Sequence, residues 1–166
     1  MGKGMKLAAM AALVTGLAAV TTPVQANPKP TEKHCVIVVG KAPKGKMSPI
    51  EAKACGDSRS AAMKALGTKA AARTLLMDWF EHANNQPNSA TSVYGSAGNC
   101  DSDGYRLRAE GFWANRISGF ASYSNCNVVT GYDLANVSGD RATWGWNTPW
   151  VGSFMNDRIE SFWIRA

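Results

Sequence analysis

Residues 112–120 read FWANRISGF, and residues 154–162 read FMNDRIESF, which is nearly the same nine-residue phrase 42 positions later. The similarity extends upstream, because LLMDWFEHANN (75–85) resembles NVVTGYDLANV (127–137) at an offset of 52. The first copy therefore holds about ten extra residues, which we place within 88–104. Repeats of about forty residues are typical of supersecondary units that cannot bury their apolar faces alone. The sequence predicts two such units, 75–125 and 126–166.

The pattern of residue types in 75–166 indicates the fold class. Short apolar or aromatic runs alternate with clusters of Gly, Asn, Asp and Ser, a pattern typical of strands joined by turns. Two units of four short strands each would pack as a Greek-key sandwich. We therefore expect an all-β, double Greek-key sandwich that forms one domain over residues 75–166.

The first 26 residues have the pattern of a secretory signal peptide. Lys3 and Lys6 precede an apolar run from Leu7 to Val20, and Val24-Gln25-Ala26 fits the small-residue rule for cleavage. The apolar run is shorter than the ~20 residues that a membrane-spanning helix needs. We expect cleavage after Ala26, a secreted chain and no transmembrane segment; the alternative is an N-terminal membrane anchor.

Residues 27–74 form a basic N-terminal flank with a different composition. CVIVVG (35–40) predicts a short strand, and the Ala-rich stretch 57–73 predicts a helix interrupted at Gly67. Residues 41–73 carry eight basic and two acidic side chains, whereas residues 75–166 carry six arginines and nine acidic groups. The acidic part suits a cation better than nucleic acid. The basic segment would contact an anionic cell-wall or membrane polymer, or would only keep the protein soluble.

Four cysteines follow the predicted cleavage site. An even number in an exported chain indicates two disulfides, for which three pairings exist. Proximity in the sequence favours Cys35–Cys55 and Cys100–Cys126. A zinc site is disfavoured, because no Cys-x₂₋₄-Cys pair occurs and the two histidines, His34 and His82, are far apart in the sequence.

The two units resemble the paired Greek-key motifs of the βγ-crystallin superfamily, in particular its small secreted bacterial members. One signature of the family is met by Tyr132, Val137 and Gly139. The second is the calcium-binding phrase Asn/Asp-Asn/Asp-x-x-Ser/Thr-Ser. NDRIES (156–161) matches it except for Glu160, and ANRISG (114–119) departs from it at both ends. The resemblance covers residues 75–166.

The resemblance implies two Ca²⁺ sites at these turns. Ca²⁺ takes six to eight oxygen ligands, which a turn rich in Asn, Asp and Ser supplies. In the family each site is shared between the two units, a turn from one meeting the first-strand acidic position of the other. One site would use Asp157, Glu160 and the Arg158 carbonyl, the other Asn115, Ser118 and the Arg116 carbonyl, with Glu81 and Asp133 completing the crossed pattern.

The departures from the family phrase leave alternatives open at these turns. If both sites bind calcium, the site with neutral Asn115 would have a lower affinity than the site with charged Asp157. Glu160, longer than Ser, would either bind the ion through both oxygens or crowd it out. In a further alternative, both turns are polar corners that only close the Greek keys.

Two other segments offer weaker candidates. DSDG (101–104) resembles the start of an EF-hand loop, but Phe112 stands where the loop needs Glu, so a hairpin turn is the better interpretation. TWGWNTPW (143–150) holds three tryptophans, which would stack on sugar rings or pack within the protein.

No constellation of catalytic residues emerges, and we expect a protein without enzymatic activity. The leading hypothesis is a secreted, monomeric, Ca²⁺-binding βγ-crystallin-like protein with a role in stability, stress or envelope association. The alternative is an inhibitor of extracellular metalloproteases, because a secreted bacterial metalloproteinase inhibitor resembles the same fold and also uses two disulfides. Its inhibitory loop would be 88–104. A further alternative is a killer-toxin-like antimicrobial protein.

The disulfide pairing is directly testable. Peptide mapping of the oxidised protein is expected to yield linked peptides containing Cys35 with Cys55 and Cys100 with Cys126. A Cys55–Cys100 peptide would contradict the division into a basic flank and a two-unit sandwich.

Overall fold

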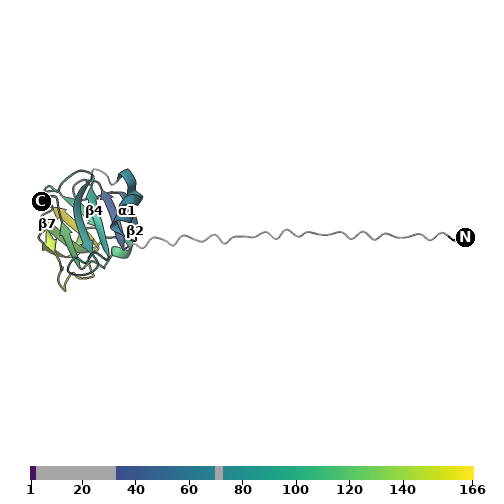
Figure 1. Cartoon of the computed structure of the whole chain (residues 1–166). Helices are drawn as coiled ribbons and strands as arrows, with labels where there is room; N and C mark the ends of the chain where they lie inside the picture. Colours follow the sequence, from purple (N-terminus) through teal and green to yellow (C-terminus); the bar gives the residue numbers. More distant parts are fainter. Residues whose placement is uncertain (3–32, 70–72) are drawn as a thin grey trace.

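The structure is a computed structural model that describes residues 1–2, 33–69 and 73–166, so the predicted signal peptide and its cleavage site lie outside the described part apart from the first two residues. Within the described part, the chain forms ten strands and one α-helix (Figure 1). These elements are β1 (His34–Val39), β2 (Ile50–Gly56), α1 (Arg59–Leu66), β3 (Thr74–Phe80), β4 (Ala90–Gly95), β5 (Tyr105–Arg108), β6 (Gly119–Ser122), β7 (Val128–Leu134), β8 (Ser138–Trp144), β9 (Asn147–Thr148) and β10 (Ser161–Arg165). Short 3₁₀ turns occur at Gly67–Lys69 and Gly111–Trp113.

The strands form two sheets whose order shows an exchange between the repeat units. The six-stranded sheet has the order β2-β1-β4-β3-β6-β9, and the four-stranded sheet has the order β5-β10-β7-β8. The first unit places β3, β4 and β6 in the larger sheet but gives β5 to the smaller one. The second unit places β7, β8 and β10 in the smaller sheet but gives β9 to the larger one. The predicted all-β double Greek-key sandwich is confirmed.

The repeated phrase supplies matching parts of the core between the sheets. Ile117 and Ile159 are fully buried, as are Phe120 and Phe162. The rings of Phe120 and Phe162 meet edge to face with centroids 5.8 Å apart, and Trp79 stacks on Phe162 at 5.8 Å. Burying each of these side chains contributes about 1.5–3 kcal/mol to the free energy of unfolding. The apolar letters of the phrase therefore recur because both units meet in one core.

Strand β1, which precedes the repeat units, lies inside the larger sheet. It pairs antiparallel with β2, where Cys35 stands directly opposite Cys55, and parallel with β4. The predicted strand 35–40 thus corresponds to β1. Its side chains alternate between the two faces of the sheet: Ile37 belongs to the core between the sheets, and Val36 and Val38 face α1.

Helix α1 covers part of the outer face of this sheet. Ser58 caps its first turn, since its hydroxyl accepts a hydrogen bond from the Ala61 backbone N–H at 3.1 Å. Gly67 ends it with a φ of 56°, a value that glycine adopts without a Cβ penalty. Ala62 and Leu66 are buried against the sheet. The helix is shorter than the predicted 57–73, although the predicted break at Gly67 is confirmed. In Figure 1, α1 and β2 lie at one side of the domain and β7 at the other.

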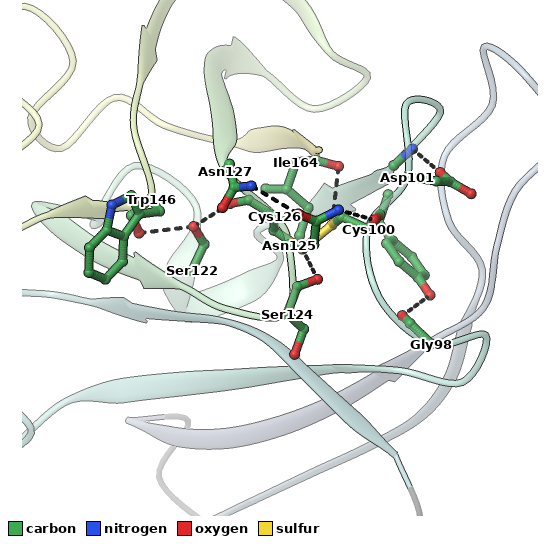
Figure 2. Close-up of a disulfide and its surroundings, with 12 residues drawn as sticks. Gly98, Cys100, Asp101, Ser122, Ser124, Asn125, Cys126, Asn127, Trp146 and Ile164 are labelled. Carbon is green, nitrogen blue, oxygen red and sulfur yellow. Dashed lines mark hydrogen bonds between the residues drawn. A yellow bond between two sulfur atoms is a disulfide. The ribbon is translucent and has the colours of Figure 1, made fainter.

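The structure contains both predicted disulfides, Cys35–Cys55 and Cys100–Cys126. The second links the loop after β4 to the segment between β6 and β7. Figure 2 shows the hydrogen bonds around it: the Asn125 amide donates to the Cys100 carbonyl at 3.1 Å, and the Cys100 N–H donates to the Ser124 carbonyl at 3.0 Å. The loop is therefore fixed on both sides of the sulfur bridge.

The segment 88–104, which the inhibitor alternative requires as its loop, contains one strand and one connecting loop. Ala90–Gly95 is strand β4, which pairs with both β1 and β3. The DSDG turn that ends the segment is held by Asp101, which accepts hydrogen bonds from the Lys41 ammonium at 2.5 Å and the Gly104 N–H at 2.8 Å. Both bonds lower the pKa of Asp101, with Lys41 the larger cause. Residues 96–104 form the connection from β4 to β5, which the Cys100–Cys126 disulfide anchors, and the inhibitor alternative stays a prediction.

A pair of glycine substitutions tests this packing. Gly98 and Gly104 both have positive φ (84° and 61°), but an added Cβ at Gly98 meets open space while one at Gly104 would collide with the Ile164 carbonyl. Gly98→Ala is expected to cost about 1–2 kcal/mol in free energy of unfolding from backbone strain alone. Gly104→Ala is expected to cost about 1–3 kcal/mol more. Urea denaturation measures both, and equal losses would contradict the close approach of β10.

Candidate functional site

The two copies of the phrase form adjacent turns with the same backbone conformation. Asn115 and Asp157, at the second position of each hexapeptide, have φ values of 59° and 55°. This left-handed region is disfavoured for most side chains, but Asn and Asp tolerate it. The Asn/Asp preference at this position therefore follows from the shape of the turn.

Backbone hydrogen bonds join the turns reciprocally. The Asn115 N–H donates to the Ile159 carbonyl at 3.1 Å, and the Asp157 N–H donates to the Ile117 carbonyl at 3.3 Å. Each turn is also tied to the first strand of its own unit. These equivalent bonds run from the Ser118 N–H to the Phe80 carbonyl (3.0 Å) and from the Glu160 N–H to the Tyr132 carbonyl (2.9 Å). The site is thus built around a local two-fold relation.

Side chains of one turn also contact side chains of the other turn, and the pairs differ from the expected ones. The Ser118 hydroxyl lies 3.4 Å from Asp157 Oδ1, and the Asn115 amide donates to Glu160 Oε1 at 2.8 Å. The resemblance predicts a different grouping, with Asp157 beside Glu160 and Asn115 beside Ser118. The structure exchanges these partners, because the second residue of each turn crosses to the fifth residue of the other turn.

The first-strand acidic residues remain with their own units. Glu81 lies 3.3 Å from the Arg116 guanidinium, and Asp133 lies 2.8 Å from that of Arg158. Arg158 also binds Asp140 at 2.9 Å. The hydrogen bond to Asp140 is the largest cause of a raised pKa for Arg158, and the bond to Asp133 adds to it against desolvation.

The arginines of the two turns have equivalent surroundings. Arg116 stacks over the ring of Phe112 at 4.7 Å, and Arg158 stacks over that of Phe154 at 5.1 Å. These contacts hold each guanidinium beside its turn. The side-chain contacts between the two units are therefore Asp157 with Ser118 and Asn115 with Glu160. Glu81 and Asp133 are instead bound by arginines of their own units.

The first of the two equivalent sites, which contains Ser118 and Asp157, opens into a surface cleft of about 550 Å³. Its walls are Glu81, His82, Ala114, Asn115, Arg116, Ser118 and Asp157. Two oxygens bound to one Ca²⁺ at about 2.4 Å, in perpendicular directions, lie roughly 3.4 Å apart. The Ser118–Asp157 spacing equals this value, so these two oxygens could be ligands of one ion. In residues 33–69 and 73–166, no three His, Cys, Asp or Glu side chains gather as a metal cluster, and a cation here would depend on hydroxyl and carbonyl oxygens as well.

The second site differs at the fifth position of its turn. Glu160 stands where the first site has Ser118, and its carboxylate is already engaged by the Asn115 amide. One oxygen of Asp133, Oδ1, is buried without a hydrogen-bond partner beside this site. The two turns therefore share a backbone plan but present different donor sets.

The tryptophan-rich segment divides between core and surface. Trp144 meets Phe120 edge to face at 5.6 Å and packs against the core. Trp146 and Trp150 are 62% and 54% exposed. The packing interpretation holds for the first of the three residues, and the stacking interpretation stays a prediction for the other two.

Sequence reasoning missed one group of polar residues on the outer face of the larger sheet. Asp78 lies within the apolar strand β3, where it is 8% exposed and contacts Tyr123 and Arg59. The signal was present in the stretch LLMDWF, because an acid inside an apolar strand rarely lacks a reason.

The disulfides bear on the compartment of the protein. Both disulfides are typical of an oxidising, extracellular environment. Among the described residues, none of the helices has the length and apolar character needed to cross a bilayer.

Searches with family models and among curated proteins find no match. Several solved structures are similar. A βγ-crystallin domain from Clostridium beijerinckii is 18% identical, with 54% of this chain and 97% of that chain covered and a TM-score of 0.42. One from Flavobacterium johnsoniae is 12% identical (55% and 94% covered, TM-score 0.40), and the N-terminal domain of protein S is 15% identical (55% and 96%, TM-score 0.39).

Two features of the chain itself define its fold: each unit gives its third strand to the other sheet, and the two turns bond to each other reciprocally. The described chain has a double Greek-key fold of the βγ-crystallin type.

Proposed function

We propose that this chain is a secreted, non-enzymatic βγ-crystallin-like protein that binds one Ca²⁺ ion in the cleft beside Ser118 and Asp157. The observation that carries the proposal is the 3.4 Å approach of these two side chains, which come from different repeat units. Ser118 supplies a hydroxyl and Asp157 a carboxylate, and the family resemblance adds the carbonyl of Arg116. Glu81 lines the same cleft, where it is paired with Arg116.

Ca²⁺ bound here would cross-link the two units. Asp157 belongs to the second unit, whereas Ser118 and Glu81 belong to the first. An ion held by both would add a bridge beside the backbone bonds that already join the turns. Because the unfolded chain does not bring these residues together, binding would stabilise the folded state.

The second site, by this proposal, does not take calcium. The Asn115–Glu160 hydrogen bond turns the amide N–H₂ of Asn115 toward the carboxylate, and an ion needs an oxygen there. The hydrogen bond between Asn115 and Glu160 thus occupies the second site, and only the first site would bind the ion.

Association with the cell envelope fits the distribution of charge. Lys44, Lys46, Lys53 and Lys64 are partly or fully exposed on the loop, edge strand and helix of the N-terminal segment. This grouping supports contact with an anionic polymer at the end of the domain formed by β2 and α1.

The calcium proposal predicts a shift in melting temperature. At about 100 times Kd, Ca²⁺ is expected to stabilise the protein by roughly 2.7 kcal/mol, on the order of 5–10 °C. Asp157→Ala and Ser118→Ala should each remove most of the difference between melts in millimolar Ca²⁺ and in EDTA. Asp103→Ala, an exposed acid outside the turns, is the matched control and should retain it. Identical wild-type melts in Ca²⁺ and EDTA would contradict the proposal.

A second prediction concerns stoichiometry. Glu160→Ser restores a hydroxyl at the fifth position and releases Asn115, so calorimetric titration should rise from about one Ca²⁺ per chain to about two, with the new site the weaker because Asn115 is neutral. Two sites of similar affinity in the wild-type protein would mean that Glu160 binds the ion rather than excluding it.

A further inference from the structure

A pocket of about 290 Å³ lies on the outer face of the six-stranded sheet, next to the start of α1. Its floor follows the register of three strands. His34 of β1, Ala90 of β4 and Phe80 of β3 stand side by side in one row, and Ser92 and Asp78 stand side by side in the next. Small side chains at Ala90 and Ser92 leave the hollow between the larger ones.

Asp78 is the unusual member of this floor. Its Oδ2 accepts a hydrogen bond from the Tyr123 hydroxyl at 3.2 Å and lies 3.7 Å from the Arg59 guanidinium. Its Oδ1 is buried and has no hydrogen-bond partner in the protein. An unsatisfied buried acceptor is costly to a fold. The Asp78 side chain also lines the pocket and is 11% exposed, so its carboxylate is a candidate for a donor that comes from outside the chain.

Arg59 supplies the complementary donor at the rim. One of its nitrogens donates to the Tyr94 hydroxyl at 2.6 Å, and its side chain is 48% exposed. Desolvation lowers the pKa of Arg59, but the hydrogen bond to Tyr94 and the charge of Asp78 outweigh it, so the net change is upward. The guanidinium stays charged and has N–H groups directed away from Tyr94. The pocket therefore presents an acceptor at its floor and donors at its edge.

We propose that this pocket binds a neutral, polyhydroxylated ligand of about the size of one sugar ring. A hydroxyl group would donate to Asp78 while its neighbours accept from Arg59 and Ser92. An ammonium ligand would be repelled by Arg59, and a carboxylate by Asp78, because the two charges lie 3.7 Å apart. Phe80, Pro87 and Ala90 add an apolar wall for the C–H face of a ring. The volume lies near the lower limit of small-molecule pockets.

The pocket and the calcium cleft share no lining residue. They are neighbours along the chain, because Phe80 lines the pocket whereas Glu81 and His82 line the cleft. The exposed Trp146 and Trp150 also lie outside the pocket. Binding in the pocket can therefore be measured in EDTA, where the proposed calcium site contributes nothing.

The test is a titration of the whole ¹⁵N-labelled chain in EDTA with D-glucose and with N-acetyl-D-glucosamine, followed by NMR. We expect saturable shifts of backbone amides near Ala90 and Ser92 with at least one sugar, at millimolar concentration. Asp78→Asn should weaken this binding at least about tenfold, because the amide is uncharged and half of it is a donor. Asp103→Asn is the matched control and should bind as the wild type does.

Further arms of the experiment separate the proposal from its rivals. Ala90→Val narrows the floor without removing a polar group and should also weaken sugar binding, while near-UV circular dichroism reports whether each variant retains its fold. Methylammonium and acetate serve as cationic and anionic probes and should not saturate the pocket. Absence of saturation by both sugars at 50 mM, tighter binding of either ion, or sugar binding that persists in Asp78→Asn would overturn the proposal.

Discussion

The reciprocal hydrogen bonds between the turns at Asn115 and Asp157 connect the two halves of the sandwich, and the placement of nearly every other feature depends on them. Each turn needs a left-handed residue at its second position, and each carbonyl that receives the bond belongs to a buried isoleucine. The same bonds therefore fix the positions of the polar turn residues and of the two isoleucines in the core. A shift of either turn would move Ile117 or Ile159 out of the core, at a cost of several kcal/mol.

The same constraint explains which parts of the structure the sequence revealed. The duplicated phrase predicts two equivalent units, because its apolar residues form part of the core in both copies. The disulfides followed from proximity along the chain. The resemblance predicts a set of turn residues as calcium donors, and nothing in ANRISG or NDRIES says that Asp157 reaches Ser118 rather than Glu160. That information lies in the positive φ of the turn, which directs the side chain toward the other unit.

Two further features lay beyond sequence reasoning for physical reasons. The apolar run 35–40 predicted a strand, but a continuous apolar strand does not specify its neighbour, and parallel pairing of β1 with β4 depends on the edge that the Greek keys leave open. The pocket at Asp78 depends on the alignment of three strands that are distant in the chain. Its only local trace is one acid within an apolar run.

The exchange of third strands also has a consequence for the order in which the chain can fold. Strand β5 of the first unit pairs with β10, and β10 is also the strand that holds β7. Neither unit can complete its sheets until residues 161–165 have been synthesised, so most of the stabilising contacts join distant parts of the chain. Such a topology has a high contact order and folds slowly. Strands β5 and β7 find the strand that joins them only once β10 is available, whereas the six-stranded sheet, which lacks β10, can form before it.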